Sequence, residues 1–302
     1  MTRKTLRAID LCAGAGGWAC AARGLPVDIV AAIDLWEPAC RTYKLNHPPT
    51  AVVCGDLRDD RVRRQVLSLH TTYRFDCVLG AIPCEWLSIR RIKAHNPVTD
   101  EELARERSTL RSVLQLVDEI GPAYWCLEDV KGLAKELPPD VPWLELDSGR
   151  FSAQRRKRIY VGRFPAPILN GSDLKLRDAL RPGPYRIGRR AADNQIVSSR
   201  QFCPGKTLAM SAEAKSLTVC SWSSRRDAEV VILDPTIPGG RRQIEWQEGA
   251  ALQGFPADYI FYGSPTDVWK MIGQAIQIHT GRAILKAIAR DAGLVTPEGR
   301  SP

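Results

Sequence analysis

A glycine-rich turn directly after the first apolar run is the feature that most constrains this chain. Residues 6–11 form the run, and the segment AGAGG at 13–17 follows it, just before a helix-like stretch. Apolar runs and helix-like stretches then alternate through the first half of the chain, which favours a parallel β-sheet with helices on both faces. The expected strands are 6–11, 28–33, 51–53, 75–79 and 124–127, and the expected helices are 18–23, 38–45, 61–69, 101–120 and 280–292.

Polar residues follow the ends of these expected strands. The carboxyl ends of parallel strands share one rim of the sheet, and ligands bind outside that rim. We therefore expect one site there, lined by Asp10, Gly14, Asp34, Asp56, Cys84 and Glu128.

The residue types at this rim suggest two kinds of chemistry. Glycines let a ligand approach the backbone closely, and a carboxylate such as Asp34 can accept hydrogen bonds from ribose hydroxyls. Cys84 follows Pro83, and Glu128 follows the next expected strand. A lone cysteine is more often a small buried hydrophobe than a nucleophile. A thiol beside a carboxylic acid, however, suits attack on an electron-poor ring with proton transfer to that ring.

Composition limits the partners of the chain. Its 302 residues are 44% hydrophobic, which is enough for a sizeable core, and they carry a net charge of +9, which suits a polyanion such as nucleic acid. The nine cysteines form no CxxC pair and only four histidines are present, so no metal site is expected. No signal-like or membrane-length apolar run occurs, so we expect no membrane association and a reducing, cytoplasmic location, in a bacterium or as a phage protein in a bacterial host.

The chain divides into three expected regions. Residues 1–164 carry the alternating pattern of a catalytic and cofactor-binding domain. Residues 165–241 are rich in Pro, Gly, Ser and Arg with weak periodicity, which indicates a small second domain or long insertion. Regular patterning returns in residues 242–295, which are expected to complete the first domain.

Six segments, in chain order, resemble the motifs of the DNA (cytosine-5) methyltransferase family. They span about residues 6 to 290, so coincidence does not explain them. The resemblance implies a Rossmann-like α/β fold that depends on S-adenosylmethionine, with a mostly parallel sheet and a small target-recognition domain at 165–241. The segments are DLCAGAGG at 10–17, IPCEWLS at 82–88, LEDV at 127–130, SAQRRKRIYVG at 152–162, RQIEWQE at 242–248 with LQGFP at 252–256, and IGQAI at 272–276.

The same resemblance implies a role for each matched residue. Cys84 attacks carbon 6 of cytosine, Glu128 contacts its N3 edge, and Arg156 and Arg158 position the base and phosphate. The target base cannot be reached inside a duplex, so it must be flipped out. Cofactor contacts are implied for Asp10, Ala13, Gly14, Gly16, Gly17, Asp34, Leu35, Asp56, Leu57, Pro83 and Gln274. Nucleic-acid contacts are implied for Ser88, Arg90, Arg91, Lys93 and Gln154.

Some positions depart from the family pattern. Glu85, Asp129 and Gln274 stand where the family has glutamine, asparagine and asparagine. The aromatic residue expected for adenine packing is replaced by Leu35, with Trp36 next to it, and the sequence leaves open which one packs.

Three hypotheses about the function therefore remain. The first is methyl transfer to carbon 5 of cytosine in double-stranded DNA by a monomer. The second is a transferase of the same fold that takes another pyrimidine or transfers another group, and the third is an RNA cytosine-5 methyltransferase. Retention of both Cys84 and Glu128 argues against a non-enzymatic relative.

Overall fold

A seven-stranded sheet forms the centre of the computed structural model, which describes residues 5–83, 99–169, 171–179, 209–211, 231–233 and 241–296. The strand order is β3-β2-β1-β4-β5-β7-β6. The pairs β1–β2, β2–β3, β1–β4 and β4–β5 are parallel, whereas β7 is antiparallel to both of its neighbours. The strands are β1 Leu6–Leu11, β2 Val27–Asp34, β3 Ala51–Cys54, β4 Cys77–Ala81, β5 Tyr124–Asp129, β6 Trp143–Asp147 and β7 Lys157–Val161.

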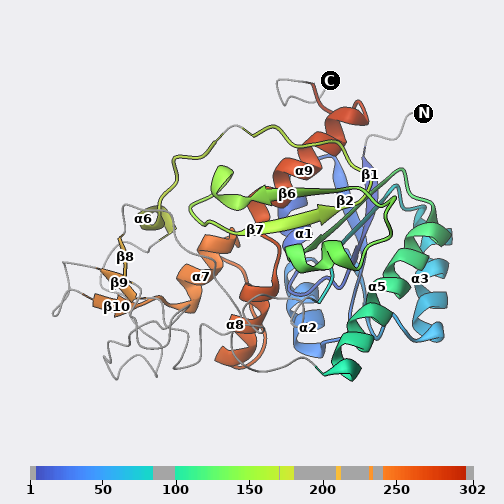
Figure 1. The fold of residues 1–302 in the computed structure, drawn as a ribbon, viewed down its shortest axis with the longest axis horizontal. Helices are drawn as coiled ribbons and strands as arrows, with labels where there is room; N and C mark the ends of the chain where they lie inside the picture. The colour runs from blue at the N-terminus through green and yellow to red at the C-terminus, as the bar shows by residue number, and fades with distance from the viewer. Residues whose placement is uncertain are drawn as a thin grey trace.

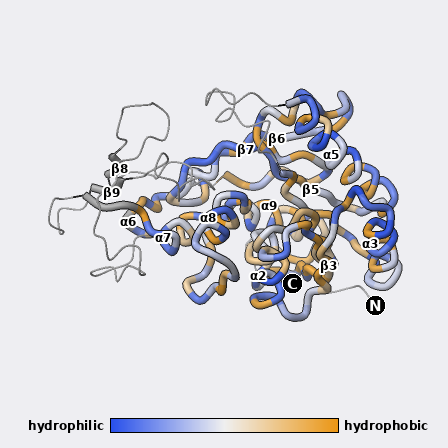
Figure 2. The backbone as a smooth tube through the Cα atoms, turned by 90° about the horizontal axis from the view of Figure 1, so that it is seen from below, coloured by the Kyte–Doolittle hydropathy of each residue, from blue (hydrophilic) through white to orange (hydrophobic). Residues whose placement is uncertain are grey.

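Helices cover both faces of the sheet (Figure 1). One apolar core joins the sheet to α3 and α5, and a second joins the opposite face to α1 and to the helices near the end of the chain. Figure 2 shows hydrophobic residues along β3 and β5 and more hydrophilic residues on the outer helix α3. These helices are α1 Gly17–Ala22, α2 Glu37–Asn46, α3 Asp60–Tyr73, α5 Asp100–Ile120, α7 Trp246–Gln253, α8 Pro265–Gln274 and α9 Ile278–Asp291.

Side-chain caps fix where several helices begin. At the start of α5 the Thr99 hydroxyl accepts from the Glu102 amide, and the Glu102 carboxylate accepts from the Thr99 amide. Ser264 and Asp267 form the same reciprocal cap on α8. These pairs satisfy amides that have no partner within the helix, and each is worth about 1 kcal/mol. Gly121 ends α5 in the left-handed conformation.

The end of the chain packs against its beginning. Helix α9 packs beside α1, and Ile276 closes over Gly17 at the start of α1. Between the two parts lie the short helix α6 Leu176–Ala179 and a separate three-stranded sheet formed by β8 Ala209–Ser211, β9 Val231–Leu233 and β10 Arg241–Gln243. None of the helices described here is both long and apolar enough to cross a bilayer.

The expected fold class is confirmed, and so are the strands and helices expected before residue 128. The sequence patterns did not predict β6 or β7, which lie between residues 143 and 161. Strand β7 inserts between β5 and β6, so the sheet is mostly rather than fully parallel.

Gly162, at the end of β7, gives a test of this strand insertion. Its φ is 136°, and an added Cβ would overlap the carbonyl of Trp125 on β5. Gly171 also has a positive φ, 75°, but its Cβ would meet nothing within 4 Å. Gly162→Ala should therefore lower the free energy of unfolding by about 3–5 kcal/mol, and Gly171→Ala by about 1–2 kcal/mol. Urea titration measures both, and equal losses would contradict the proposed contact.

Candidate active site

Four carboxylates converge around the end of β1. Burial raises the pKa of the Cys12 thiol, and the nearby negative charges of Asp34, Asp10, Asp56 and Asp129 raise it further. These acids come from the ends of β1, β2, β3 and β5. The parallel connectivity thus brings together residues that are far apart in sequence, as expected for the rim of such a sheet.

Asp34 holds the glycine turn in place. Its Oδ2 accepts from the Gly14 amide at 2.7 Å, and its Oδ1 accepts from the Trp36 amide at 2.8 Å. Burial raises the pKa of the Asp34 carboxyl, while these amide hydrogen bonds act in the opposite direction. The carboxylate therefore ties the end of β2 to the turn after β1.

The glycines of the turn face different surroundings. A Cβ on Gly14, whose φ is +53°, would meet no atom within 4 Å. A Cβ on Gly16 would lie 2.9 Å from the Tyr259 hydroxyl, and one on Gly17 would lie 2.9 Å from Ile276 Cγ1. Gly14 is thus the position where a ligand could approach the backbone, whereas Gly16 and Gly17 make room for other parts of the chain. Ala13, at the start of the turn, is largely buried, and its amide donates to the Ile33 carbonyl.

The residues expected on the adenosine side are divided between surface and interior. Leu35 is 54% exposed, whereas Leu57 is buried. Trp36 is partly buried against the core, and the Lys270 ammonium lies 4.6 Å from its ring centroid. Asp56 forms an ion pair with Arg58, which lowers the pKa of the Asp56 carboxyl.

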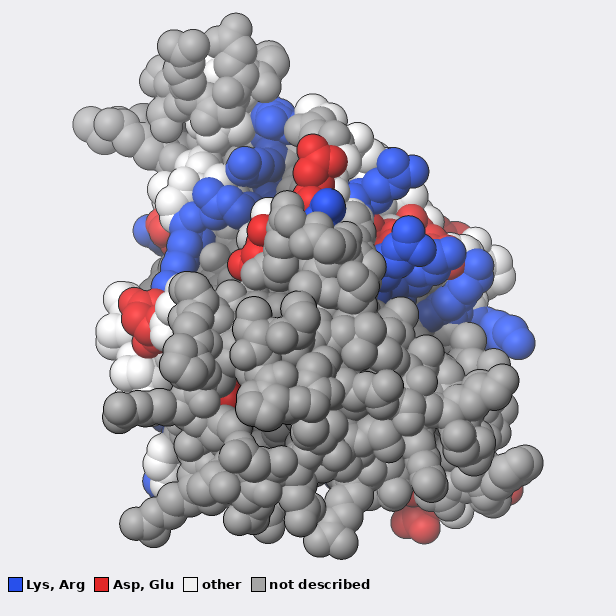
Figure 3. All heavy atoms as spheres, turned by 90° about the vertical axis from the view of Figure 1, so that its left-hand side faces the viewer, with Lys and Arg blue, Asp and Glu red and all other residues white. Residues whose placement is uncertain are grey.

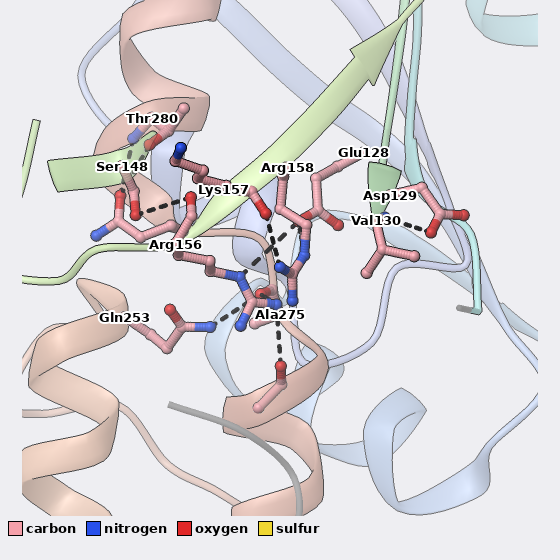
Figure 4. Close-up of polar contacts among 12 residues, drawn as sticks. Glu128, Asp129, Val130, Ser148, Arg156, Lys157, Arg158, Gln253, Ala275 and Thr280 are labelled. Atoms are coloured by element: carbon pink, nitrogen blue, oxygen red, sulfur yellow. Dashed lines mark hydrogen bonds and ion pairs between the residues drawn. The ribbon is translucent and has the colours of Figure 1, made fainter. Parts of the chain in front are cut away.

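Glu128 is a buried acid at the end of β5. Only 3% of it is exposed, and the Arg158 Nε lies 3.2 Å from its Oε1 (Figure 4). Arg156 Nε lies farther away, at 3.9 Å. Burial raises the pKa of Glu128, and the two arginines act against that rise. The carboxyl is therefore held in place by two cations, while its burial shifts its titration to higher pH.

Arg156 joins this acid to the end of α8. Arg156 is 3% exposed, and its Nη2 donates to the carbonyls of Gly273 at 3.0 Å and Ala275 at 3.3 Å. Gln253 also donates to the Ala275 carbonyl, at 2.9 Å. The side chains of Arg156 and Gln253 thus hold the backbone of the segment 272–276 in place. The Gln274 side chain in this segment is exposed.

The expectation that Gln154 contacts nucleic acid finds no exposed surface to support it. The residue is 0% exposed. Its side-chain amide donates to the Leu252 carbonyl at 3.2 Å and to Gln253 Oε1 at 2.9 Å. Gln154 lies in the connection between β6 and β7, and its side chain links this connection to α7. Asp10 is equally buried, with the Tyr43 hydroxyl donating to its Oδ2 at 3.4 Å.

Asp129, one of the departures from the family pattern, is fully buried. Its Oδ1 accepts from the Val130 amide at 2.5 Å, and in the described part of the chain its Oδ2 has no hydrogen-bond partner. Burial and the neighbouring Glu128 raise the pKa of the Asp129 carboxyl well above its usual value. The site thus favours a neutral side chain at this position.

Several expected residues lie outside the described ranges. They are Cys84, Glu85, Ser88, Arg90, Arg91 and Lys93. The described chain leads up to them: β4 pairs in register with β5, with Ala81 opposite Glu128, and the Ile82 amide donates to the Glu128 carbonyl at 3.2 Å. Pro83 follows and is exposed.

Three residues at the site had not been singled out from the sequence. Gln253 lay inside a recognised motif, so the motif was the signal that could have found it. Lys270 and Tyr259 stand in ordinary helical and loop sequence, and only tertiary packing brings them to Trp36 and the glycine turn. No cluster of three or more metal-binding side chains occurs among the described residues.

Comparison with known proteins gives the family. The C-5 cytosine-specific DNA methylase family matches residues 6–137 and 185–290, which is most of the chain. The chain therefore belongs to this family and is a DNA (cytosine-5) methyltransferase by that membership.

Individual relatives agree over nearly the full length. The chain is 24% identical to the Type II methyltransferase M.NgoMIV of Neisseria gonorrhoeae, over 94% of this chain and 98% of that protein. It is 30% identical to the Type II methyltransferase M.HgiDI of Herpetosiphon aurantiacus, over 91% of each. Among solved structures, the S. pombe Dnmt2 methyltransferase superposes with a TM-score of 0.69 at 16% identity, over 95% of this chain and 99% of that one. That last likeness shows the fold.

Asp129→Asn should stabilise the protein at neutral and alkaline pH. Because the folded state raises the pKa of this carboxyl, its contribution to stability is present in acid and is lost as the pH rises through the folded pKa. An amide keeps the bond from Val130 and has no charge to desolvate. The thermal midpoint at pH 8 should rise by roughly 3 °C or more, and the gain should shrink toward pH 5. Asp118→Asn, at an exposed position on α5, is the control. A gain that does not depend on pH would contradict this account.

Proposed function

We propose that this protein transfers a methyl group from S-adenosylmethionine to carbon 5 of a flipped-out cytosine in double-stranded DNA, with Cys84 as the covalent nucleophile. The observation that carries the proposal is the place of Glu128. It is a buried acid held by Arg158, and its strand is in register with β4, which runs directly into Pro83 and Cys84. Cys84 comes three residues after the end of β4 in the sequence, and Glu128 belongs to the neighbouring strand β5, which supports a role for both in one reaction.

The residues at the glycine turn suit the proposed cofactor. Gly14 leaves room at the backbone, and Asp34 fixes the turn beside it. Leu35 is the better candidate to pack on adenine, because the Trp36 ring already has Lys270 over it. Asp56 would accept from the adenine amine, and Pro83 and Gln274 would border the site. The cofactor supplies an electrophilic methyl group on a sulfonium, and the remaining roles belong to the chain.

The chain's own residues would carry out the base chemistry. The Cys84 thiolate forms a bond to carbon 6, and protonated Glu128 gives a proton to N3, so that carbon 5 becomes nucleophilic. After methylation a base removes the proton on carbon 5, the bond from Cys84 to carbon 6 breaks, and N3 returns its proton to Glu128. Arg158 and Arg156 keep Glu128 in place throughout.

Positive charge near this site suits a DNA backbone. Around the start of β7, Arg155 and Lys157 are exposed, whereas Arg156 between them is buried, as the alternation of a strand requires. Arg150 is exposed nearby. Figure 3 shows Lys and Arg side chains gathered on the upper part of the face that it draws. We propose phosphate contacts for these exposed residues, with Ser88, Arg90, Arg91 and Lys93 contributing from the segment after Cys84, and base recognition by residues 165–241.

Mass spectrometry of nucleosides tests the proposal directly. DNA and tRNA from cells that express the protein should show 5-methylcytosine in DNA only. Another modified base or another added mass would favour an altered pocket, and a product in tRNA would favour the RNA enzyme. Glu85→Gln in the same assay should leave the product unchanged.

Cys84→Ala should abolish methyl transfer while cofactor binding survives, because the thiolate takes part only in the reaction. Intact-mass analysis of the wild type with S-adenosylmethionine and DNA that contains 5-fluorocytosine should show a stable adduct at Cys84. Fluorine stands in place of the carbon 5 proton and cannot be removed by a base, so the thiolate is not eliminated. Cys54→Ala, which removes an exposed thiol, should retain turnover. Turnover by Cys84→Ala would refute the covalent route.

The pH profile tests the role of Glu128. Because burial raises its pKa, the protonated acid persists to higher pH, and kcat should fall as the pH rises through that pKa. Glu128→Gln should lower kcat by about 10²–10⁴-fold and remove this alkaline limb, because an amide cannot transfer the proton. Glu119→Gln, at an exposed ion pair with Arg63, should keep the wild-type profile. The same limb in Glu128→Gln would assign it to another group.

A further inference from the structure

A short chain of hydrogen bonds, separate from the contact with Asp34, reaches the glycine turn. The Tyr259 hydroxyl donates to the Ala15 carbonyl, across 244 positions of sequence. His47 Nε2 lies 3.1 Å from the same hydroxyl, and the two rings are 5.9 Å apart. Tyr259 is buried, so this chain of contacts is shielded from solvent.

The direction of these bonds follows from the number of protons. The single hydroxyl proton of Tyr259 goes to the Ala15 carbonyl, so the hydroxyl oxygen must accept in its contact with His47. The proton of that contact therefore belongs to His47 Nε2. Burial, with a contribution from Arg23, lowers the pKa of His47 to about 4, so near neutral pH the ring is uncharged and carries its proton on Nε2.

Gly16 is shaped to admit this pair. With a φ of +86°, its missing Cβ would lie 2.9 Å from the Tyr259 hydroxyl and 3.1 Å from His47 Nε2. The glycine at this position thus makes room for the two side chains, while Gly14 is the one that faces open space.

The end of α2 holds Tyr259 in position. The Asn46 side chain donates to the Ile260 carbonyl at 2.7 Å and accepts from the Ile260 amide at 2.9 Å. The Tyr262 amide donates to Thr42 Oγ1 at 2.9 Å. These contacts fix the part of the loop between α7 and α8 that directly follows the tyrosine.

We propose that His47 and Tyr259 are positioning residues for the cofactor: together they hold the Ala15 carbonyl and so fix the glycine turn against which the methionine end binds. Asp34 holds the Gly14 amide and Tyr259 holds the Ala15 carbonyl, so the turn is set before the cofactor binds. This inference rests on the proposed use of S-adenosylmethionine. Neither residue touches the reacting atoms, so their loss affects binding of the cofactor and leaves the chemical step intact.

Removal of one hydroxyl tests the idea. Tyr259→Phe should raise the Kd for S-adenosylmethionine and for S-adenosylhomocysteine by about tenfold, the worth of one hydrogen bond, and raise KM for the cofactor while kcat stays near the wild-type value. Tyr262→Phe is the matched control. It removes a hydroxyl from the same loop, but that hydroxyl accepts from Arg41 at 2.5 Å and does not reach the turn. Calorimetry gives Kd, and the thermal midpoint of each variant confirms that it is folded.

A double-mutant cycle distinguishes an effect of His47 that passes through the Tyr259 hydroxyl from a general loss of local stability. His47→Phe keeps a ring beside Tyr43 and Tyr259 but removes the donor, and it should raise Kd by about threefold on its own. In the Tyr259→Phe background it should add nothing, because its effect passes through the hydroxyl. His47→Gln, which restores an N–H donor, should recover part of the affinity.

The outcomes are distinct. Unchanged cofactor affinity in Tyr259→Phe, an equal loss in Tyr262→Phe, or additive effects in the cycle would each overturn the inference while the proposed function stands. A wild-type protein that binds no S-adenosylmethionine would overturn both.

Discussion

The buried guanidinium of Arg156 is the interaction on which the rest of the site depends. A charge in the interior is costly unless it is paired and hydrogen-bonded, and Arg156 meets Glu128 on one side and the Gly273 and Ala275 carbonyls on the other. It can do so only because β7 inserts antiparallel between β5 and β6. The same arginine therefore links the proposed catalytic acid with the final motif of the chain.

The glycine turn after β1 depends on a similar meeting of distant segments. Asp34 binds the Gly14 amide, Tyr259 binds the Ala15 carbonyl, and Ile276 packs over Gly17. Each contact comes from a different part of the sequence. A flexible turn that is fixed in this way has less conformational freedom to lose when a ligand binds, which is the physical basis of preorganisation.

The departures from the family pattern differ in their physical setting. Asp129 is fully buried beside Glu128, where desolvation favours the neutral form of its carboxyl. A neutral carboxyl is closer in charge to the asparagine of the family pattern than a carboxylate is. Gln274 is exposed at the end of α8 and is one methylene longer than asparagine, so its environment can accommodate the change. Leu35 is exposed at the end of β2 and keeps an apolar surface where an aromatic ring is usual.

The sequence by itself determined the order of strands and helices as far as β5, and its ordered motifs determined the family. It also determined that Asp10, Asp34, Asp56 and Glu128 stand at strand ends along one rim, because this follows from the connectivity of a parallel sheet. Only the tertiary structure decided that β7 is antiparallel, that Gln154 points inward, and that Lys270 covers Trp36. It also decided that Gly16 makes room for Tyr259 and His47. These features depend on contacts between residues many tens of positions apart, and local periodicity and motif spacing carry no information about which side chains meet across such separations.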